Sequence, residues 1–204
     1  MSRHDRLPGV ILAGGQATRM GGGDKCLRRV AGKRLIDMVI DRLAPQCAPI
    51  AINANGDPSR WAEFDLPVLA DSLPDHPGPL AGVLVGLDWA AGLGARAIVT
   101  VAADTPFFPR DLAARLKRAA AASGLALAAS RDEHGRLWRH PTFGLWPVAL
   151  REDLRTSLQG GLRKIVAWTE RHGAGLAEFD SVPFDPFFNI NTPEDIARAE
   201  ELIA

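Results

Sequence analysis

The chain alternates between short apolar runs that suit buried strands and longer stretches with the spacing of helices. Apolar runs at residues 10–12, 50–52, 68–70 and 98–101 predict strands. The stretches after the first and third runs carry apolar residues on one helical face, namely Leu35, Ile36, Val39, Ile40 and Leu43, then Leu80, Val83, Leu84 and Leu87. Strands that alternate with helices are typical of a parallel sheet covered by helices. We therefore predict an α/β fold.

In the last third of the chain, the pattern predicts helices and strands in a less regular order. The expected elements are a strand at residues 125–129, a hairpin around residues 132–135 and helices near residues 150–157 and 162–170. A final helix is expected after Thr192, because threonine is a favoured N-cap and Pro193 suits the first helical position. The acids Glu194 and Asp195 complement the positive end of that helix.

Polar residues stand where the predicted strands end. Asn53 follows the second strand, Asp71 follows the third, and Asp104 follows the fourth. Open α/β sheets bind their ligands at the carboxyl ends of the strands. The sequence therefore predicts a ligand site that includes these three residues.

Composition narrows the class of ligand. The chain has 204 residues, which suits one domain, and its 24 basic and 24 acidic residues give a formal net charge of zero. Without a basic tract or a long apolar stretch, we expect a small-molecule ligand and neither a nucleic acid nor a membrane partner. Cys26 and Cys47 are not in CxxC spacing, and the N-terminus lacks the apolar region of a signal peptide, so we expect a cytoplasmic protein.

A glycine-rich segment, LAGGQATRMGGGDK at residues 12–25, follows the first predicted strand. Its glycines, Gly14 and Gly15 among them, allow backbone N–H groups to approach anionic oxygens. Arg19 and Lys25 add positive charge, so the segment predicts a phosphate-binding loop. It matches neither the Walker pattern nor GxGxxG, and a flexible surface loop is the alternative.

This segment resembles the signature of the molybdenum cofactor guanylyltransferase family. Further motifs of that family follow in order, at residues 53–55, 71, 78–82, 104–107 and 189–195. The resemblance implies a single domain over residues 1–204, with a Rossmann-like, mostly parallel mixed sheet and helices on both faces. It also implies transfer of GMP from GTP to molybdopterin, with Mg2+ as cofactor. Residues 1–125 are expected to bind GTP and the metal, and residues 126–204 the acceptor.

The resemblance implies roles for single residues. Asp104 is expected to hold Mg2+, which prefers carboxylate oxygens, while Lys25 and Arg19 stabilise charge on the phosphates. The expected GTP contacts are Leu12, Ala13, Gly14, Gly15, Asn53, Asp71 and Gly78. Asn189 and Asn191 stand at strand spacing, so both are expected to face the acceptor.

Plainer interpretations remain open for these residues. Asp104 could cap a turn, Lys25 could be a solvated surface lysine, and asparagine and aspartate are common at strand ends. The pair Asn189 and Asn191 could instead brace the last helix.

Two rival functions remain. A molybdopterin cytidylyltransferase would use CTP, although that relative reads LAAG where this chain has LAGG. A binding module would hold nucleotide and cofactor without turnover, and Lys25 with Asp104 argues against it. Ala102 and Ala103 replace the family's usual Pro-Cys or Pro-Ala before Asp104. We expect a monomer that contacts molybdoenzymes or cofactor-biosynthesis proteins transiently.

Overall fold

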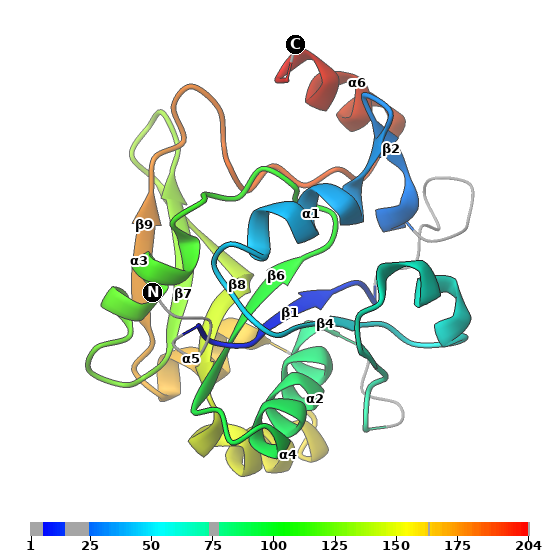
Figure 1. Ribbon diagram of the computed structural model, residues 1–204. Helices are drawn as coiled ribbons and strands as arrows, with labels where there is room; N and C mark the ends of the chain where they lie inside the picture. The colour runs from blue at the N-terminus through cyan, green and yellow to red at the C-terminus, as the bar shows by residue number, and fades with distance from the viewer. Residues whose placement is uncertain (1–5, 15–24, 74–77, 163, 204) are drawn as a thin grey trace.

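The computed structural model describes residues 6–14, 25–73, 78–162 and 164–203. Within this part of the chain, seven strands form one sheet in the order β5-β4-β1-β6-β8-β7-β9 (Figure 1). The strands are β1 (Gly9–Leu12), β4 (Ile50–Asn53), β5 (Val68–Leu69), β6 (Ala97–Ala102), β7 (Ala126–Arg131), β8 (Leu137–Pro147) and β9 (Gly175–Phe179). The sheet joins the early and late parts of the sequence into the single α/β domain that was predicted.

The strand directions make the sheet mixed but mostly parallel. β1 runs parallel to β4 on one side and to β6 on the other, with Gly9 opposite both Ile50 and Val99. β4 is also parallel to β5, and β7 is parallel to β9. β8 runs antiparallel to its neighbours β6 and β7. The carboxyl ends of β5, β4, β1 and β6 therefore meet along one edge of the sheet.

Helices cover both faces of the sheet, as predicted (Figure 1). The helices are α1 (Leu35–Leu43), α2 (Pro79–Gly92), α3 (Leu112–Ala119), α4 (Arg151–Gln159), α5 (Ile165–Arg171) and α6 (Pro193–Glu201), with 3-10 turns η3 (Lys25–Leu27), η4 (Pro58–Phe64) and η5 (Val148–Leu150). α1 and α3 pack on one face, and α2, α4 and α5 pack on the other. Successive residues of β1 point to opposite faces, so Ile11 joins the first core and Val10 the second. Burial of each of these side chains contributes roughly 1.5–3 kcal/mol.

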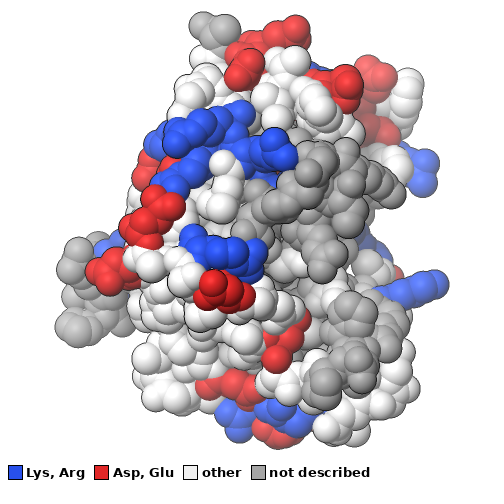
Figure 2. All heavy atoms as spheres, turned by 90° about the vertical axis from the view of Figure 1, so that its right-hand side faces the viewer, with Lys and Arg blue, Asp and Glu red and all other residues white. Residues whose placement is uncertain are grey.

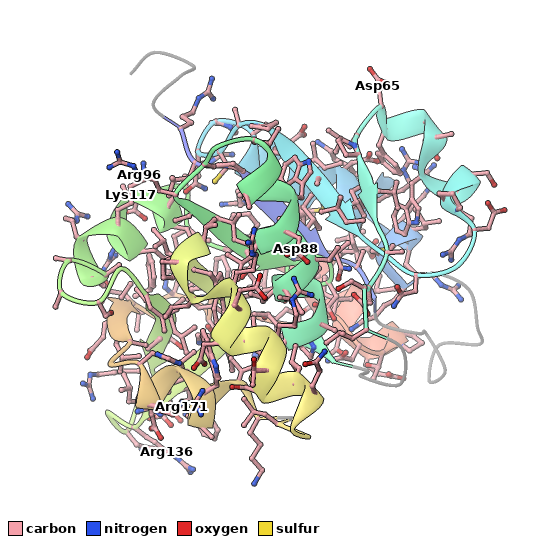
Figure 3. All side chains as sticks on the ribbon, turned by 90° about the horizontal axis from the view of Figure 1, so that it is seen from below. Asp65, Asp88, Arg96, Lys117, Arg136 and Arg171 are labelled. Carbon is pink, nitrogen blue, oxygen red and sulfur yellow. The ribbon has the colours of Figure 1, made fainter. Side chains whose placement is uncertain are left out.

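Helix α2 is fixed between the sheet and α4. A Cβ atom on Gly86 would lie 2.9 Å from Ile98 Cδ1 and 3.0 Å from Val10 Cγ2, so glycine is what lets the helix approach the sheet this closely. On its outer side, the Asp88 carboxylate accepts a hydrogen bond from the Arg155 guanidinium of α4 at 2.7 Å (Figure 3). These contacts hold the first turn of α2 at the carboxyl edge of the sheet.

A short hairpin follows η3 and lies against the C-terminal helix. Its strands β2 (Arg29–Val30) and β3 (Lys33–Arg34) are antiparallel. The turn residues Ala31 and Gly32 have φ values of 47° and 80°, as in the turns that suit two-residue hairpins. The Ala31 N–H donates to the Glu200 carboxylate of α6 at 2.9 Å. The end of the chain is thereby packed beside the segment that carries Lys25.

Candidate active site

The candidate site lies at the carboxyl edge, where β1 ends between β4 and β6. The Ala13 N–H donates to the Asn53 carbonyl at 2.9 Å, and the Ala103 N–H donates to the Leu12 carbonyl at 3.1 Å. These bonds continue the pairing at the strand ends and place Leu12, Ala13 and Gly14 between the segments that carry Asn53 and Asp104. Because neighbouring strands are about 4.8 Å apart, β4 and β6 lie roughly 10 Å from each other.

Lys25 occupies the centre of the first side-chain cluster. Its ammonium donates to Asp104 Oδ2 at 2.6 Å, to Asn189 Oδ1 at 3.1 Å and to Asn191 Oδ1. An ammonium has three N–H donors, and each of them has one of these oxygens as its partner. Lys25 is only 9% exposed, so it is not a solvated surface lysine. We call these four residues the Lys25 cluster.

The segment 189–191 is held rigidly beside Lys25. The Ile190 N–H donates to the Asp104 carbonyl at 2.9 Å, and the Ile190 side chain is fully buried between the hairpin, α1 and α6. The neighbouring side chains of Asn189 and Asn191 point the other way, toward Lys25. The Asp195 carboxylate accepts the N–H groups of Asn191 and Thr192 at 2.8 and 2.9 Å. The predicted helix cap at Thr192 therefore also braces the candidate site.

An aromatic contact anchors the same segment from its other side. The Phe187 ring stacks on the His140 imidazole with centroids 4.1 Å apart. His140 Nε2 lies 2.7 Å from the hydroxyl of Ser130, which is buried in the sheet. Burial lowers the pKa of the His140 imidazole, and the nearby Asp185 carboxylate opposes that change. This neutral ring gives Phe187 a fixed surface two residues before Asn189.

A second cluster lies at the ends of β4 and β5. The Asn53 side-chain amide donates to the Leu69 carbonyl at 3.0 Å and to Asp71 Oδ1 at 2.9 Å. The Asn55 amide donates to Asp71 Oδ2 at 2.8 Å, and its oxygen accepts the Asp71 backbone N–H at 2.8 Å. The orientation of the Asp71 carboxylate is therefore fixed by two amides. We call Asn53, Asn55 and Asp71 the Asp71 cluster.

Glycines at the start of α2 make room for the Asp71 cluster. A Cβ atom on Gly82 would lie 2.1 Å from Asn53 Oδ1, so no other residue fits without moving Asn53. Gly78 precedes the helix with φ of 137°, a conformation that L-residues rarely adopt. The Asp71 cluster and the first turn of α2 therefore depend on each other.

The structure brings most of the predicted residues to one edge, on the two sides of β1. Gly15 and Arg19 lie outside the described residues. Sequence reasoning assigned no role to Asn55 or Gly82, although both stand inside motifs that it singled out. Trp146 and Trp168 belong to the core, whereas Trp138 is 47% exposed in the β7–β8 hairpin, where its indole N–H donates to the Asp132 carboxylate at 2.9 Å.

The residues present fit a divalent cation that is held largely by its substrate. The described part of the chain contains no group of three or more His, Cys, Asp or Glu residues that could hold a metal by itself. Asp104 offers a carboxylate at the strand end, and Thr105 Oγ1 lies 3.2 Å from its Oδ1. Mg2+ characteristically binds one or two carboxylates and completes its shell with phosphate oxygens and water. Asp104 is the side chain that could serve in this way.

Charged side chains of both signs lie on the described part of the face in Figure 2. Lys and Arg side chains there lie close to Asp and Glu side chains. No helix in the described ranges has both the length and the apolar composition needed to cross a membrane.

Comparison with known proteins identifies the family. The sequence model described as "MobA-like NTP transferase domain" matches residues 9–174. A molybdenum cofactor guanylyltransferase from Bradyrhizobium sp. (strain ORS 278) is 52% identical over 203 residues, which cover 97% of this chain and 93% of the relative. The protein of that name from Cereibacter sphaeroides is 49% identical over 199 residues, which cover 97% of each.

Solved structures share the fold. The molybdopterin-guanine dinucleotide biosynthesis protein A from Archaeoglobus fulgidus superposes with a TM-score of 0.72 at 23% identity, covering 97% of this chain and 98% of that one. The 4-diphosphocytidyl-2C-methyl-D-erythritol synthase from Anaerococcus prevotii superposes with a TM-score of 0.70 at 14% identity, covering 97% and 96%. At these identities the likeness concerns the fold alone. The sequence matches, which extend over nearly the whole chain, place this protein in the molybdenum cofactor guanylyltransferase family.

Proposed function

We propose that the chain transfers GMP from GTP to the phosphate of molybdopterin and releases pyrophosphate. The observation that carries the proposal is the buried Lys25 ammonium paired with Asp104 at the carboxyl edge, in a chain 52% identical to a protein named molybdenum cofactor guanylyltransferase. Nucleotidyl transfer needs positioning and charge neutralisation more than covalent catalysis. Lys25 and Asp104 are suited to that task without a nucleophilic serine or cysteine.

The proposed reaction is a displacement at the α-phosphorus of GTP. An oxygen of the acceptor phosphate forms the new P–O bond, and the bond from the α-phosphorus to the bridging oxygen breaks, so that its electron pair leaves with pyrophosphate. Lys25 binds phosphate oxygens and stabilises the charge on the leaving group. Arg19 assists from the same loop. Asp104 would hold a divalent cation, Mg2+ in this proposal, which would neutralise phosphate charge.

The Asp71 cluster is proposed to read the base. Guanine presents N1–H and N2–H side by side, and a carboxylate accepts such a pair of donors well. Asp71 is held for this by Asn53 and Asn55. Cytosine has an acceptor at N3 beside its amino group, so it would place a lone pair against the carboxylate. A site built to accept hydrogen bonds rejects such a mismatch strongly.

The remaining proposed contacts are assigned to one of the two substrates, GTP or molybdopterin. We propose that residues 1–125 hold GTP, with backbone groups of Leu12, Ala13, Gly14 and Gly15 against the nucleotide and Gly78 at its phosphates. Residues 126–204 are proposed to hold the acceptor near Asn189 and Asn191. Both asparagines contact Lys25, so the two parts would meet where the reacting phosphates meet.

The cellular compartment, the oligomeric state and the protein partners are also proposed. Cys26 and Cys47 are buried cysteines that form no disulfide, which suits a reducing cytoplasm. Burial raises the pKa of the Cys47 thiol to about 12, so that this cysteine is unreactive at neutral pH. We propose a monomer that contacts molybdoenzymes or cofactor-biosynthesis proteins only transiently.

Thermal stability in the presence of nucleotides tests the proposed function. With Mg2+ present, GTP at about one hundred times its Kd should raise the Tm by roughly 5–10 °C, because a ligand that binds only the folded state stabilises it. CTP at the same concentration should give a much smaller shift. Pyrophosphate release with molybdopterin should show the same preference.

Two other outcomes would each favour one of the rival functions. A larger Tm shift and faster pyrophosphate release with CTP would indicate a cytidylyltransferase. A Tm shift with GTP but no pyrophosphate release from GTP and molybdopterin would indicate a binding module.

Replacing Gly82 by Ala should weaken GTP binding. The new Cβ would meet Asn53 Oδ1 at 2.1 Å, so Asn53 must move and the Asp71 carboxylate loses a fixed partner. We expect the KM for GTP to rise by about 10-fold, which corresponds to the 1–3 kcal/mol that overpacking typically costs. Gly92→Ala is the matched control, because a Cβ there meets no atom within 4 Å. An unchanged KM in Gly82→Ala would contradict the role given to the Asp71 cluster.

A further inference from the structure

We propose that Lys25 blocks the metal site until a triphosphate arrives, so that the divalent cation binds with the nucleotide or after it, and not before. The inference rests on the proposed function and adds an order of binding to it. It follows from which oxygens of the chain the Lys25 ammonium contacts, and from how few other metal-ligating side chains the described part of the site contains.

The chain itself supplies a hydrogen-bond acceptor for each of the three N–H donors of the Lys25 ammonium. Its donors are matched by Asp104 Oδ2 at 2.6 Å, Asn189 Oδ1 at 3.1 Å and Asn191 Oδ1. The three oxygens come from two segments that the bond between the Ile190 N–H and the Asp104 carbonyl ties together. The ammonium therefore sits in a preformed cage of oxygens, which is the environment that any small cation requires.

A divalent cation would compete with this ammonium. Asp104 is the carboxylate of the Lys25 cluster, and its Oδ2 is taken by Lys25 while Thr105 contacts its Oδ1. A metal on either oxygen would lie a few ångströms from the positive charge of Lys25, where the two cations repel each other strongly. No set of three acidic, histidine or cysteine side chains elsewhere in the described ranges compensates. The metal and the caged ammonium therefore exclude each other.

A bound triphosphate removes the conflict. Its oxygens give the Lys25 ammonium a new set of acceptors, and a charged lysine on a flexible stem can exchange one anionic partner for another. Asp104 is then left without its cation, next to phosphate oxygens that can share a metal with it. Nucleotide binding thereby raises the affinity for the metal, and linkage requires that the metal raises the affinity for nucleotide by the same factor.

The proposal is tested by measuring metal binding without nucleotide. Mn2+ alone, followed by its electron paramagnetic resonance signal, serves as the probe with the full chain. Wild type should bind Mn2+ weakly, and Lys25→Met should bind it at least ~10-fold more tightly, since removing a unit charge a few ångströms from a divalent ion exceeds one tenfold step in affinity. Adding Asp104→Asn to Lys25→Met should abolish the gain.

A control variant distinguishes the loss of the Lys25 ammonium from a general change in the net charge of the protein. Lys33→Met makes the same change at a lysine that pairs with the exposed Asp41, and it should leave Mn2+ affinity within about 2-fold of wild type. If Lys25→Met does not fold, Lys25→Gln tests the same point. That variant removes the positive charge beside Asp104 but keeps a side-chain amide that can donate to the same oxygens, and it should raise Mn2+ affinity by about 3-fold.

The proposal is overturned if wild type and Lys25→Met bind Mn2+ equally, because Lys25 and the metal would then coexist on Asp104. It is also overturned if the gain survives Asp104→Asn. These measurements need neither GTP nor acceptor. A failure of the proposed function, seen as absent pyrophosphate release in wild type, is therefore a separate result.

Discussion

Replacing Asp104 by Asn should reduce the rate of pyrophosphate release from GTP and molybdopterin by at least ~100-fold, the usual scale for removing one key electrostatic group. The substitution keeps the shape of the side chain but removes the negative charge that pairs with Lys25 in the structure and is proposed to hold the divalent cation during turnover. Initial rates at saturating GTP and Mg2+ measure the effect. The loss should appear in kcat, because the charge acts on the reacting phosphates.

The control for this substitution is Asp111→Asn. Asp111 precedes α3 and its side chain makes no capping hydrogen bond, so the same change of charge there should leave kcat within about 2-fold of wild type. Full turnover in Asp104→Asn with only a raised KM would refute the catalytic role of Asp104. A binding module would then account better for the site.

Lys25→Met should lower kcat by about 100-fold while folding is retained. Methionine has a similar length but no charge, so the phosphates lose their partner in the reacting state. The same variant is expected to bind metal more tightly without nucleotide. These opposite effects on turnover and metal affinity would not arise from a general loss of structure.

Lys33→Met and Lys25→Arg complete the comparison. Lys33 lies in the hairpin beside the site and should tolerate the change. Arginine keeps the charge of Lys25 but not its compact shape, and we expect it to recover only part of kcat because the cage fits an ammonium. Equal turnover in Lys25→Met and wild type, measured well below the Tm of each, would show that Lys25 has no catalytic role.

Much of the fold could be predicted because the decisive signals are local. The apolar runs that became β1, β4 and β6 are continuous, those of β4 and β6 lead into Asn53 and Asp104, and the α1 and α2 stripes keep helical spacing. Parallel strands bring such ends to one edge, so Asn53, Asp71 and Asp104 could be placed there by topology alone. The cap at Thr192 is equally local, and the structure confirms it.

Other elements lacked such a signal. β8 has an irregular burial pattern, and its pairing with β7 shifts register between Leu127 and Ala128, so no simple alternation marks it. The strands of the β2–β3 hairpin have two residues each, too few for any periodicity. Helix α3 does carry an amphipathic pattern, and the sequence interpretation passed over it.

The contacts within the site could not be predicted from spacing. Lys25 meets Asn189 and Asn191 across 164 and 166 residues, and only the folded chain shows that these amides hold an ammonium. The resemblance assigned the two asparagines to the acceptor, which stays a prediction. The need for glycine at position 82 is similarly hidden, because it arises from a side chain on another element.

The attachment of the segment 189–191 to Asp104 has a consequence for protein synthesis. Two of the three oxygens around Lys25 belong to residues 164 and 166 positions later in the sequence, and the braces at Thr192 and Asp195 come later still. A nascent chain whose first half has already emerged from the ribosome can form the early strands, but it cannot complete this cluster. Molecules that lack residues 189–195 would therefore hold Lys25 poorly, so catalytic competence would be acquired only after that segment has been synthesised.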